Sequence, residues 1–307
     1  MVDPSRRDRV GLGLIGLGPS WELLYRPAIE RLQKRLTIRL AYDTVEARAR
    51  SVAADFEAEP VGSLHQMLNR PTLQGLLILD PGWLGAGALD CIARSGKPVY
   101  LASPILRRAA ELHRLLREQS PSADSGSYAV IPDDRWMPEL RLRFTPASCR
   151  LRELIATRLG PVKEIQVGCN LDADPLEIAH IVDWCADLMG QTQVVTQASD
   201  GSESIRFEFA PSGNSPRHRT ARLRQSSGGL TCEVTCVRGR AVLRDRTYIR
   251  WEAAEQAAEE HLHDERSEIE ILIDQFCRRA VGGLNPVGRL EEFSRAMRIV
   301  ESLPHRR

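Results

Sequence analysis

The sequence has few lysines, few aromatic residues and no long apolar run. Lysine occurs only at Lys34, Lys97 and Lys163 among 42 basic residues, which leaves few positions for lysine chemistry. The formal net charge of +1 gives no electrostatic reason to expect binding to nucleic acid or to an anionic membrane. No apolar stretch approaches the roughly 20 residues of a membrane-spanning helix. We therefore expect a globular, cytoplasmic chain with room for two domains.

The sequence also lacks a cysteine framework. Its 7 cysteines are an odd, scattered set, which indicates reduced thiols rather than disulfides in a chain of 307 residues. Cys232 and Cys236 lie in one strand-like run, and four residues of strand separate them by roughly 13 Å, too far to share one metal ion. We expect no metal site.

The most informative stretch, 10–21, reads VGLGLIGLGPSW. An apolar run leads into a glycine turn at Gly16 and Gly18 and then into a helical pattern. This order is how an α/β domain cradles a dinucleotide pyrophosphate, because glycine lets backbone N–H groups approach the phosphates. The third fingerprint position, where helix and strand pack closely, is Trp21 instead of glycine. A tight turn in any doubly wound sheet explains the segment equally well.

Strand-like and helix-like segments alternate in the first part of the chain, which indicates a parallel sheet covered on both faces. Asp43 closes the second strand, where a carboxylate can accept hydrogen bonds from the ribose of NAD and disfavours the 2′-phosphate of NADP. A helix-capping role for Asp43 is compatible with that one. Strands are expected at 10–15, 37–42, 75–80, 99–102 and 128–131, and helices at 25–35, 45–56, 63–68, 84–94 and 105–119.

The pattern changes after the polar connection 120–127. A helix is expected at 146–158, with Thr145 as its N-cap and Pro146 at its first position. Strand-like runs follow at 162–169, 193–197, 204–209, 220–224, 230–237, 241–243 and 248–251, with helices at 176–189, 264–280 and 289–302. We predict an α/β fold class: a Rossmann-type parallel sheet in a dinucleotide-binding domain over 1–131, followed by an α+β domain with a large open, mainly antiparallel sheet over 132–307.

Several local runs resemble one enzyme family: GLG followed by RPAI, ARSGKPVYLASPI, LRFTPASCRLRELI, HIVDW and QFCRRAVGGLNPVGRLEEFSRAMRIVES. With the domain order, they resemble the glucose–fructose oxidoreductase, inositol dehydrogenase and MocA (Gfo/Idh/MocA) family over nearly the whole chain. Its members are mostly NAD(P)-dependent dehydrogenases of sugars and polyols. The resemblance implies an NAD cofactor and a small sugar-like ligand, and it places the cofactor at Gly16, Gly18, Asp43, Pro81 and Pro104.

The catalytic pattern that this resemblance implies is poorly kept. After the fourth strand the family has Glu-Lys-Pro, and its lysine binds substrate and cofactor, but this chain has Ala102, Ser103 and Pro104. Serine has neither the charge nor the reach of lysine. After the third strand, Gly85 stands where the family has a histidine.

The expected helix 176–189 corresponds to the active-site helix, where the family has Asp-x-Gly-x-His. Leu176 replaces the aspartate, the histidine remains as His180, and Asp183 follows one turn later on the same face. The catalytic candidates are therefore His180, Asp183 and Ser103. A histidine beside apolar helix residues is more often structural, so we expect little catalysis from His180.

A positioned proton-transfer group typically contributes ~100- to 10,000-fold in rate. Losing both the lysine and the aspartate should remove ordinary dehydrogenase turnover. We also expect NAD binding to be weak or absent, because Trp21 occupies the close-packing position and Gly85 and Ala102 offer no polar side-chain contact. We therefore favour a catalytically degenerate family member, a pseudoenzyme with at most weak nucleotide or sugar binding. One alternative is an active NAD(P)-dependent oxidoreductase with rearranged catalytic groups, and another is an oligomeric interaction protein.

Arg135, Trp136 and Arg143 precede the helix that leads into the second domain, a region that faces the cleft in the family. An indole can stack on a sugar ring while a guanidinium binds hydroxyls, although ordinary surface roles explain them as well. For assembly, alternation in the strand run 205–209 predicts one apolar and one polar face. The apolar face could pack on the chain's own helices or on a partner. Because the family resemblance implies that the closing helices return toward the first domain, we expect an exposed apolar face that builds a homo-oligomer through this sheet.

Overall fold

The computed structural model describes residues 9–80, 82–118, 135–190, 194–199, 204–209, 219–263, 265–283 and 288–303. Contacts divide the chain into two compact units, Met1–Glu139 with Arg266–Arg295, and Leu140–Glu265 with Ala296–Arg307. The expected boundary between 131 and 132, the expected strand 128–131 and Pro81 all lie outside the described residues. Within the described residues, no helix is long and apolar enough to cross a membrane.

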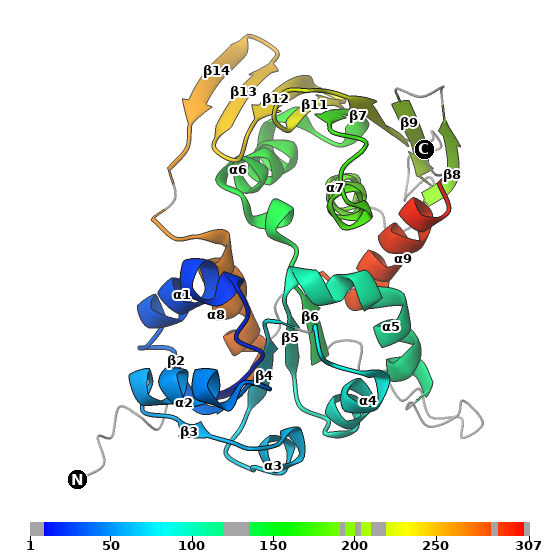
Figure 1. Ribbon diagram of the computed structural model, residues 1–307. Helices are drawn as coiled ribbons and strands as arrows, with labels where there is room; N and C mark the ends of the chain where they lie inside the picture. The colour runs from blue at the N-terminus through cyan, green and yellow to red at the C-terminus, as the bar shows by residue number, and fades with distance from the viewer. Residues whose placement is uncertain are drawn as a thin grey trace, which may run out of the picture. The chain divides into compact units, whose positions relative to one another are not determined.

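The first unit is built on a six-stranded parallel sheet with the order β3-β2-β1-β4-β5-β6 (Figure 1). The strand order reverses direction between β1 and β4, which is where open α/β sheets bind ligands, beyond the carboxyl ends of the strands. The predicted Rossmann-type sheet is therefore confirmed. Its strands are β1 (Val10–Ile15), β2 (Leu36–Tyr42), β3 (Glu59–Pro60), β4 (Gly75–Ile78), β5 (Val99–Leu101) and β6 (Trp136–Pro138).

Helices cover this sheet, as the alternating pattern predicts. Ser63 caps α3 by accepting a hydrogen bond from Gln66 N. Near the end of the chain, α8 returns to the first unit and packs on α1, where Asp274 Oδ1 accepts a hydrogen bond from Arg35 Nε at 3.0 Å. The helices are η2 (Trp21–Tyr25), α1 (Arg26–Arg31), α2 (Glu46–Asp55), α3 (Leu64–Leu68), α4 (Ala86–Arg94), η3 (Ser103–Arg108), α5 (Ala109–Glu118) and α8 (Glu268–Ala280).

Trp21 changes the start of the helix that follows the glycine turn. The indole is 4% exposed and meets the Phe56 ring edge to face, with ring centroids 5.9 Å apart. The first turn, Trp21–Tyr25, is a π-helix, which is wider than an α-helical turn. A wider turn gives room for an indole at the position where the fingerprint expects glycine and close packing.

The second unit contains an eight-stranded sheet with the order β14-β13-β12-β11-β7-β10-β9-β8. Only the pair β7–β10 is parallel, so the predicted open, mainly antiparallel sheet is confirmed. β14 was not expected, since its sequence QAAEEH lacks β-branched and aromatic residues. The strands are β7 (Val162–Cys169), β8 (Val194–Ser199), β9 (Ser204–Phe209), β10 (Arg219–Gln225), β11 (Thr231–Cys236), β12 (Gly239–Arg244), β13 (Tyr248–Ala253) and β14 (Gln256–His261).

One face of this sheet is apolar and covered. Its side chains, among them Val167, Cys232 and Phe207, are at most 5% exposed. The helices η6 (Arg141–Phe144), α6 (Pro146–Leu154), η7 (Ile155–Leu159) and α7 (Pro175–Leu188) belong to the same unit, and Figure 1 shows α6 and α7 on one side of the sheet. Thr145 caps α6 as predicted, accepting a hydrogen bond from Ser148 N. The last helix of the chain is α9 (Leu290–Glu301).

The expectation of an exposed apolar face is therefore wrong. The apolar side chains pack on the unit's own helices, because residues of α7 such as Ile181 and Cys185 are buried too. The outward side chains of the described strands are mostly charged or hydroxylated, as the alternating burial of β9 and β11 illustrates. Any assembly through this sheet must use a polar face.

Candidate functional site

The glycine turn after β1 is closely packed against Asp80. Gly16 has a φ of 77°, a left-handed conformation that favours glycine, and a Cβ there would overlap the backbone of Asp80. A Cβ on Gly18 would overlap the carboxylate of Asp80. Both fingerprint glycines are thus needed here, and what approaches Gly18 is a side chain of the same chain.

Asp43 lies at the end of β2 and is buried. Its Oδ2 accepts a hydrogen bond from Leu17 N in the glycine turn at 2.7 Å, and its Oδ1 accepts one from Val45 N at 2.7 Å. The second bond closes a turn before α2, whose N-cap is Val45 and has no side-chain capping hydrogen bond, so the predicted capping role of Asp43 is wrong. The first ties the turn to β2 with a charge-assisted hydrogen bond. Each carboxylate oxygen that was expected to bind a ribose hydroxyl therefore already serves a backbone N–H group.

The positions expected to hold the catalytic lysine and its neighbours lie after β5. Ser103 begins the 3-10 helix η3, and Pro104 is exposed at its second position. The ammonium of Lys97 is engaged elsewhere: its Nζ donates hydrogen bonds to the carbonyls of Arg70 and Leu73, each at 3.2 Å. Gly85 is the N-cap of α4 and a Cβ on it would meet open space. Position 103, where the family has its lysine, therefore carries no cationic side chain.

In the second unit, two predicted site residues bind each other. The Arg143 guanidinium forms a bidentate pair with Asp183, with Nη2–Oδ1 at 2.7 Å and Nε–Oδ2 at 2.9 Å, and its Nη1 reaches Asp187 Oδ1 at 3.1 Å. Arg143 and Asp183 are only 7% and 3% exposed. A buried carboxylate held by a guanidinium is a poor general base, because proton binding would break the pair.

His180 is one turn before Asp183 on α7. Burial, together with the nearby charge of Arg141, lowers the pKa of His180 to about 4. The imidazole is therefore neutral at pH 7 and a weak base, far from the pKa near neutrality that suits proton transfer. Leu176, at the family's aspartate position, is buried at the start of α7.

The other two cleft candidates, Arg135 and Trp136, belong to the first unit. Arg135 is exposed, and its Nη1 donates a hydrogen bond to the carbonyl of Gly96 at 2.9 Å. Trp136 is 2% exposed as the first residue of β6. The indole is thus part of the first unit's sheet, with no exposed ring face for a sugar.

Asp80 and Trp83 were not singled out from the sequence. Trp83 follows β4 and meets the Tyr42 ring edge to face, with centroids 5.3 Å apart. Its Nε1 is buried, and no described residue forms a hydrogen bond with it. The only local signal was an aspartate directly after an apolar strand, and such a residue is common in turns.

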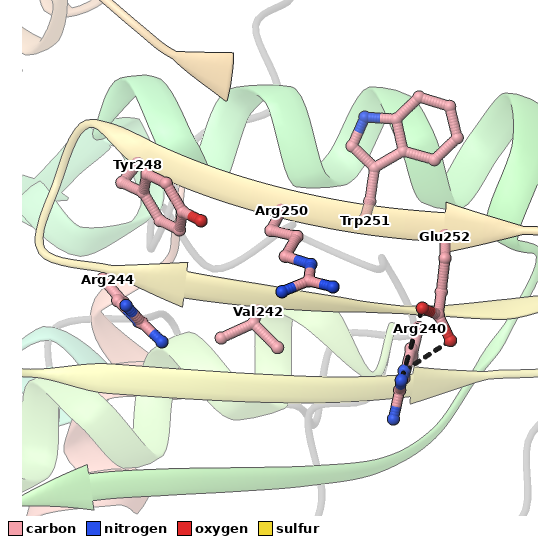
Figure 2. A pocket seen from close by; sticks show the side chains of 7 residues that line it. All are labelled: Arg240, Val242, Arg244, Tyr248, Arg250, Trp251 and Glu252. Carbon is pink, nitrogen blue, oxygen red and sulfur yellow. Dashed lines mark hydrogen bonds and ion pairs between the residues drawn. The ribbon is translucent and has the colours of Figure 1, made fainter. Parts of the chain in front are cut away.

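The outer face of the second sheet carries a hollow of about 180 Å3, lined by Arg240, Val242, Arg244, Tyr248, Arg250, Trp251 and Glu252 (Figure 2). Figure 2 shows the guanidinium groups around Val242, with Trp251 directed away from them. The register places Val242 between Glu233 and Arg250, and Arg250 opposite Glu259. Three arginines and one glutamate line the hollow, and glutamates of the neighbouring strands lie beside them.

The described residues contain no cluster of side chains suited to metal binding or to thiol chemistry. No group of three or more His, Cys, Asp and Glu side chains there could hold a metal ion. All 7 cysteines are free thiols. Burial raises the pKa of Cys169 to about 11, so this thiol is not a nucleophile at neutral pH.

No family model and no curated protein matches the sequence. A solved structure from Desulfitobacterium hafniense, described as an NADPH-dependent oxidoreductase, has a TM-score of 0.72 at 16% identity and covers 96% of this chain and 94% of that one. KijD10, a 3-ketoreductase from Actinomadura kijaniata in complex with NADP, has a TM-score of 0.65 at 16% identity and covers 96% of each chain.

The chain has the fold of the Gfo/Idh/MocA-type oxidoreductases. That fold is not confined to enzymes: the transcriptional regulator Gal80p from Kluyveromyces lactis has a TM-score of 0.69 at 11% identity, covering 96% of this chain and 88% of that one. Identities this low carry the fold alone, so activity has to be inferred from the site.

Titration should show the unusual state of His180. An ordinary histidine has a pKa of about 6.5, so as the pH falls the unfolded chain binds this proton before the folded chain does. The contribution of neutral His180 to stability is therefore complete above pH ~6.5 and is lost as the pH falls toward ~4. NMR of the histidine rings, assigned with His180→Gln, should give a midpoint near 4. A midpoint above about 6 would contradict this account.

The buried pair can be tested by unfolding. Asp183→Asn keeps the side-chain shape but removes the charge facing Arg143, so the free energy of unfolding should fall by about 3 kcal/mol. The control is Arg94→Ala, which removes an exposed pair with Asp90 (Nε–Oδ2 2.8 Å) and should cost at most about 0.5 kcal/mol. Urea titrations compare the two, and equal losses would contradict a structural role for the Arg143–Asp183 pair.

Proposed function

We propose that this chain is a catalytically degenerate protein of the Gfo/Idh/MocA fold, without dehydrogenase turnover and with at most weak NAD or sugar binding. The observation that carries the proposal is the bidentate Arg143–Asp183 pair, since it withdraws both a candidate base and a candidate substrate ligand. Two further observations support it: the pKa of His180 is lowered to about 4, and a serine stands at the lysine position.

Two proton-transfer or charged groups of the family's catalytic pattern are missing from this chain. A single positioned proton-transfer group contributes ~100- to 10,000-fold in rate. Here the lysine position holds Ser103 and the aspartate position holds Leu176, while His180 is the only titratable residue kept from the pattern. A weak base cannot replace both an ammonium and a carboxylate. The alternative, an active NAD(P)-dependent oxidoreductase with rearranged groups, requires His180 to act alone.

A substrate screen tests this proposal. The protein is incubated with a panel of sugars and inositols and with NAD+ or NADP+, and NADH or NADPH production is followed by absorbance. We expect no turnover above a protein-free control. Ser103→Lys should not restore activity, because Leu176 still lacks the carboxylate. Robust turnover that His180→Ala abolishes would reject the degenerate assignment and make His180 the acid–base group.

We propose in addition that the chain forms a homo-oligomer through the outer face of the second sheet. The support is Val242, an apolar side chain among alternating arginines and glutamates that a second copy could pair with in a two-fold arrangement. An assembly of this kind depends on charge pairs and should weaken at high salt.

Light scattering tests the assembly. The wild-type protein should be larger than a monomer at tens of micromolar, well above a weak ~1 μM interface. Val242→Glu should dissociate it, whereas Val45→Glu, at a 45% exposed valine of the first unit, should not. A wild-type monomer at that concentration would reject the idea.

A further inference from the structure

The glycine turn touches an aspartate where a nucleotide-binding turn touches phosphate. In such turns the second glycine is small so that the pyrophosphate can approach the backbone. Here the space beside Gly18 holds the Asp80 carboxylate, which a Cβ on Gly18 would overlap. The glycine therefore fits this chain's own side chain, which in this conformation occupies the place that a phosphate would take.

Charge adds to this steric argument. The Asp80 carboxylate is held in place by Gly82 N, which donates to its Oδ1 at 3.1 Å. Within the described residues, Asp80 has no ion-pair partner. A pyrophosphate is itself an anion, and like charges a few ångströms apart in a partly buried site repel each other.

An aromatic pair then crosses the end of β1. β1 lies between β2 and β4, with Ile15 paired to Tyr42 on one side and to Ile78 on the other. Tyr42 ends β2 and Trp83 follows β4, yet their rings are in contact at 5.3 Å. The two rings therefore meet across the carboxyl end of β1. A dinucleotide bound to this sheet order runs through that same crevice.

The closed arrangement is not ideal for Trp83. Its indole Nε1 is buried and has no hydrogen-bond partner among the described residues, and an unpaired buried donor is unfavourable. Trp83 lies between Gly82 and the buried Leu84. These features fit side chains that fill a crevice rather than a core optimised for packing.

We propose that Asp80, Tyr42 and Trp83 form an internal plug that occupies the dinucleotide crevice of the first unit. The plug explains why the chain keeps glycine at Gly16 and Gly18 without requiring a nucleotide there. It rests on the proposed function, because it gives the physical cause of weak NAD binding. It also makes a separate claim: removing the plug opens a site that the fold otherwise retains.

Calorimetric titration with NAD+ and with ADP-ribose tests the plug. Asp80→Asn removes the charge with little change in volume, Trp83→Ala removes the bridging ring, and Asp80→Ala with Trp83→Ala removes both. The double variant should bind ADP-ribose at least about tenfold more tightly than the wild type, with Asp80→Asn giving part of that gain. The control is Asp90→Asn, which removes one exposed negative charge on α4 and should bind like the wild type. Circular dichroism and thermal unfolding establish that each variant is folded.

The outcomes separate the two proposals. A wild type that binds NAD+ with micromolar affinity overturns both the plug and the degenerate assignment. A wild type and folded variants that all fail to bind overturn the plug alone. Should the double variant fail to fold, the two single variants decide: a gain in either one supports the plug, and no gain in both overturns it.

Discussion

Two carboxylates hold the glycine turn of the first unit, and the character of the candidate site depends on them. Asp43 accepts a hydrogen bond from Leu17 N, and Asp80 fills the space that Gly18 leaves open. A nucleotide-binding turn offers its N–H groups and its open space to an anion. In this chain both are used by the protein itself, so the turn acts as a structural joint between β1, β2 and β4.

The second unit follows the same principle with different groups. Arg143 and Asp183 are the types of residue that could bind a hydroxyl and move a proton, but they are buried and satisfy each other. A buried guanidinium with two carboxylate partners is rigid and well satisfied, and either charge left alone would be costly. In both units, side chains of a kind that could act on a ligand make contacts within the protein instead.

The sequence predicts the periodic parts of this structure well and its pairings poorly. β1 was predicted at Val10–Ile15 because a continuous apolar run bounded by glycine indicates a buried strand. β14 was missed, since QAAEEH becomes a strand only by pairing with β13. The Arg143–Asp183 pair joins residues 40 positions apart. Asp80 contacts Gly18, which lies 62 positions earlier in the sequence, and no local sequence pattern predicts that contact.

A glycine fingerprint shows that something approaches the backbone closely, but it does not say what. At Gly18 the neighbour can be a phosphate of a ligand or a side chain of the same protein, and both require the absence of a Cβ. In this chain the neighbour is Asp80, shortly after the adjacent parallel strand β4. With Asp80 at that position, the glycines are explained by internal packing, and they lose their weight as evidence for a bound dinucleotide.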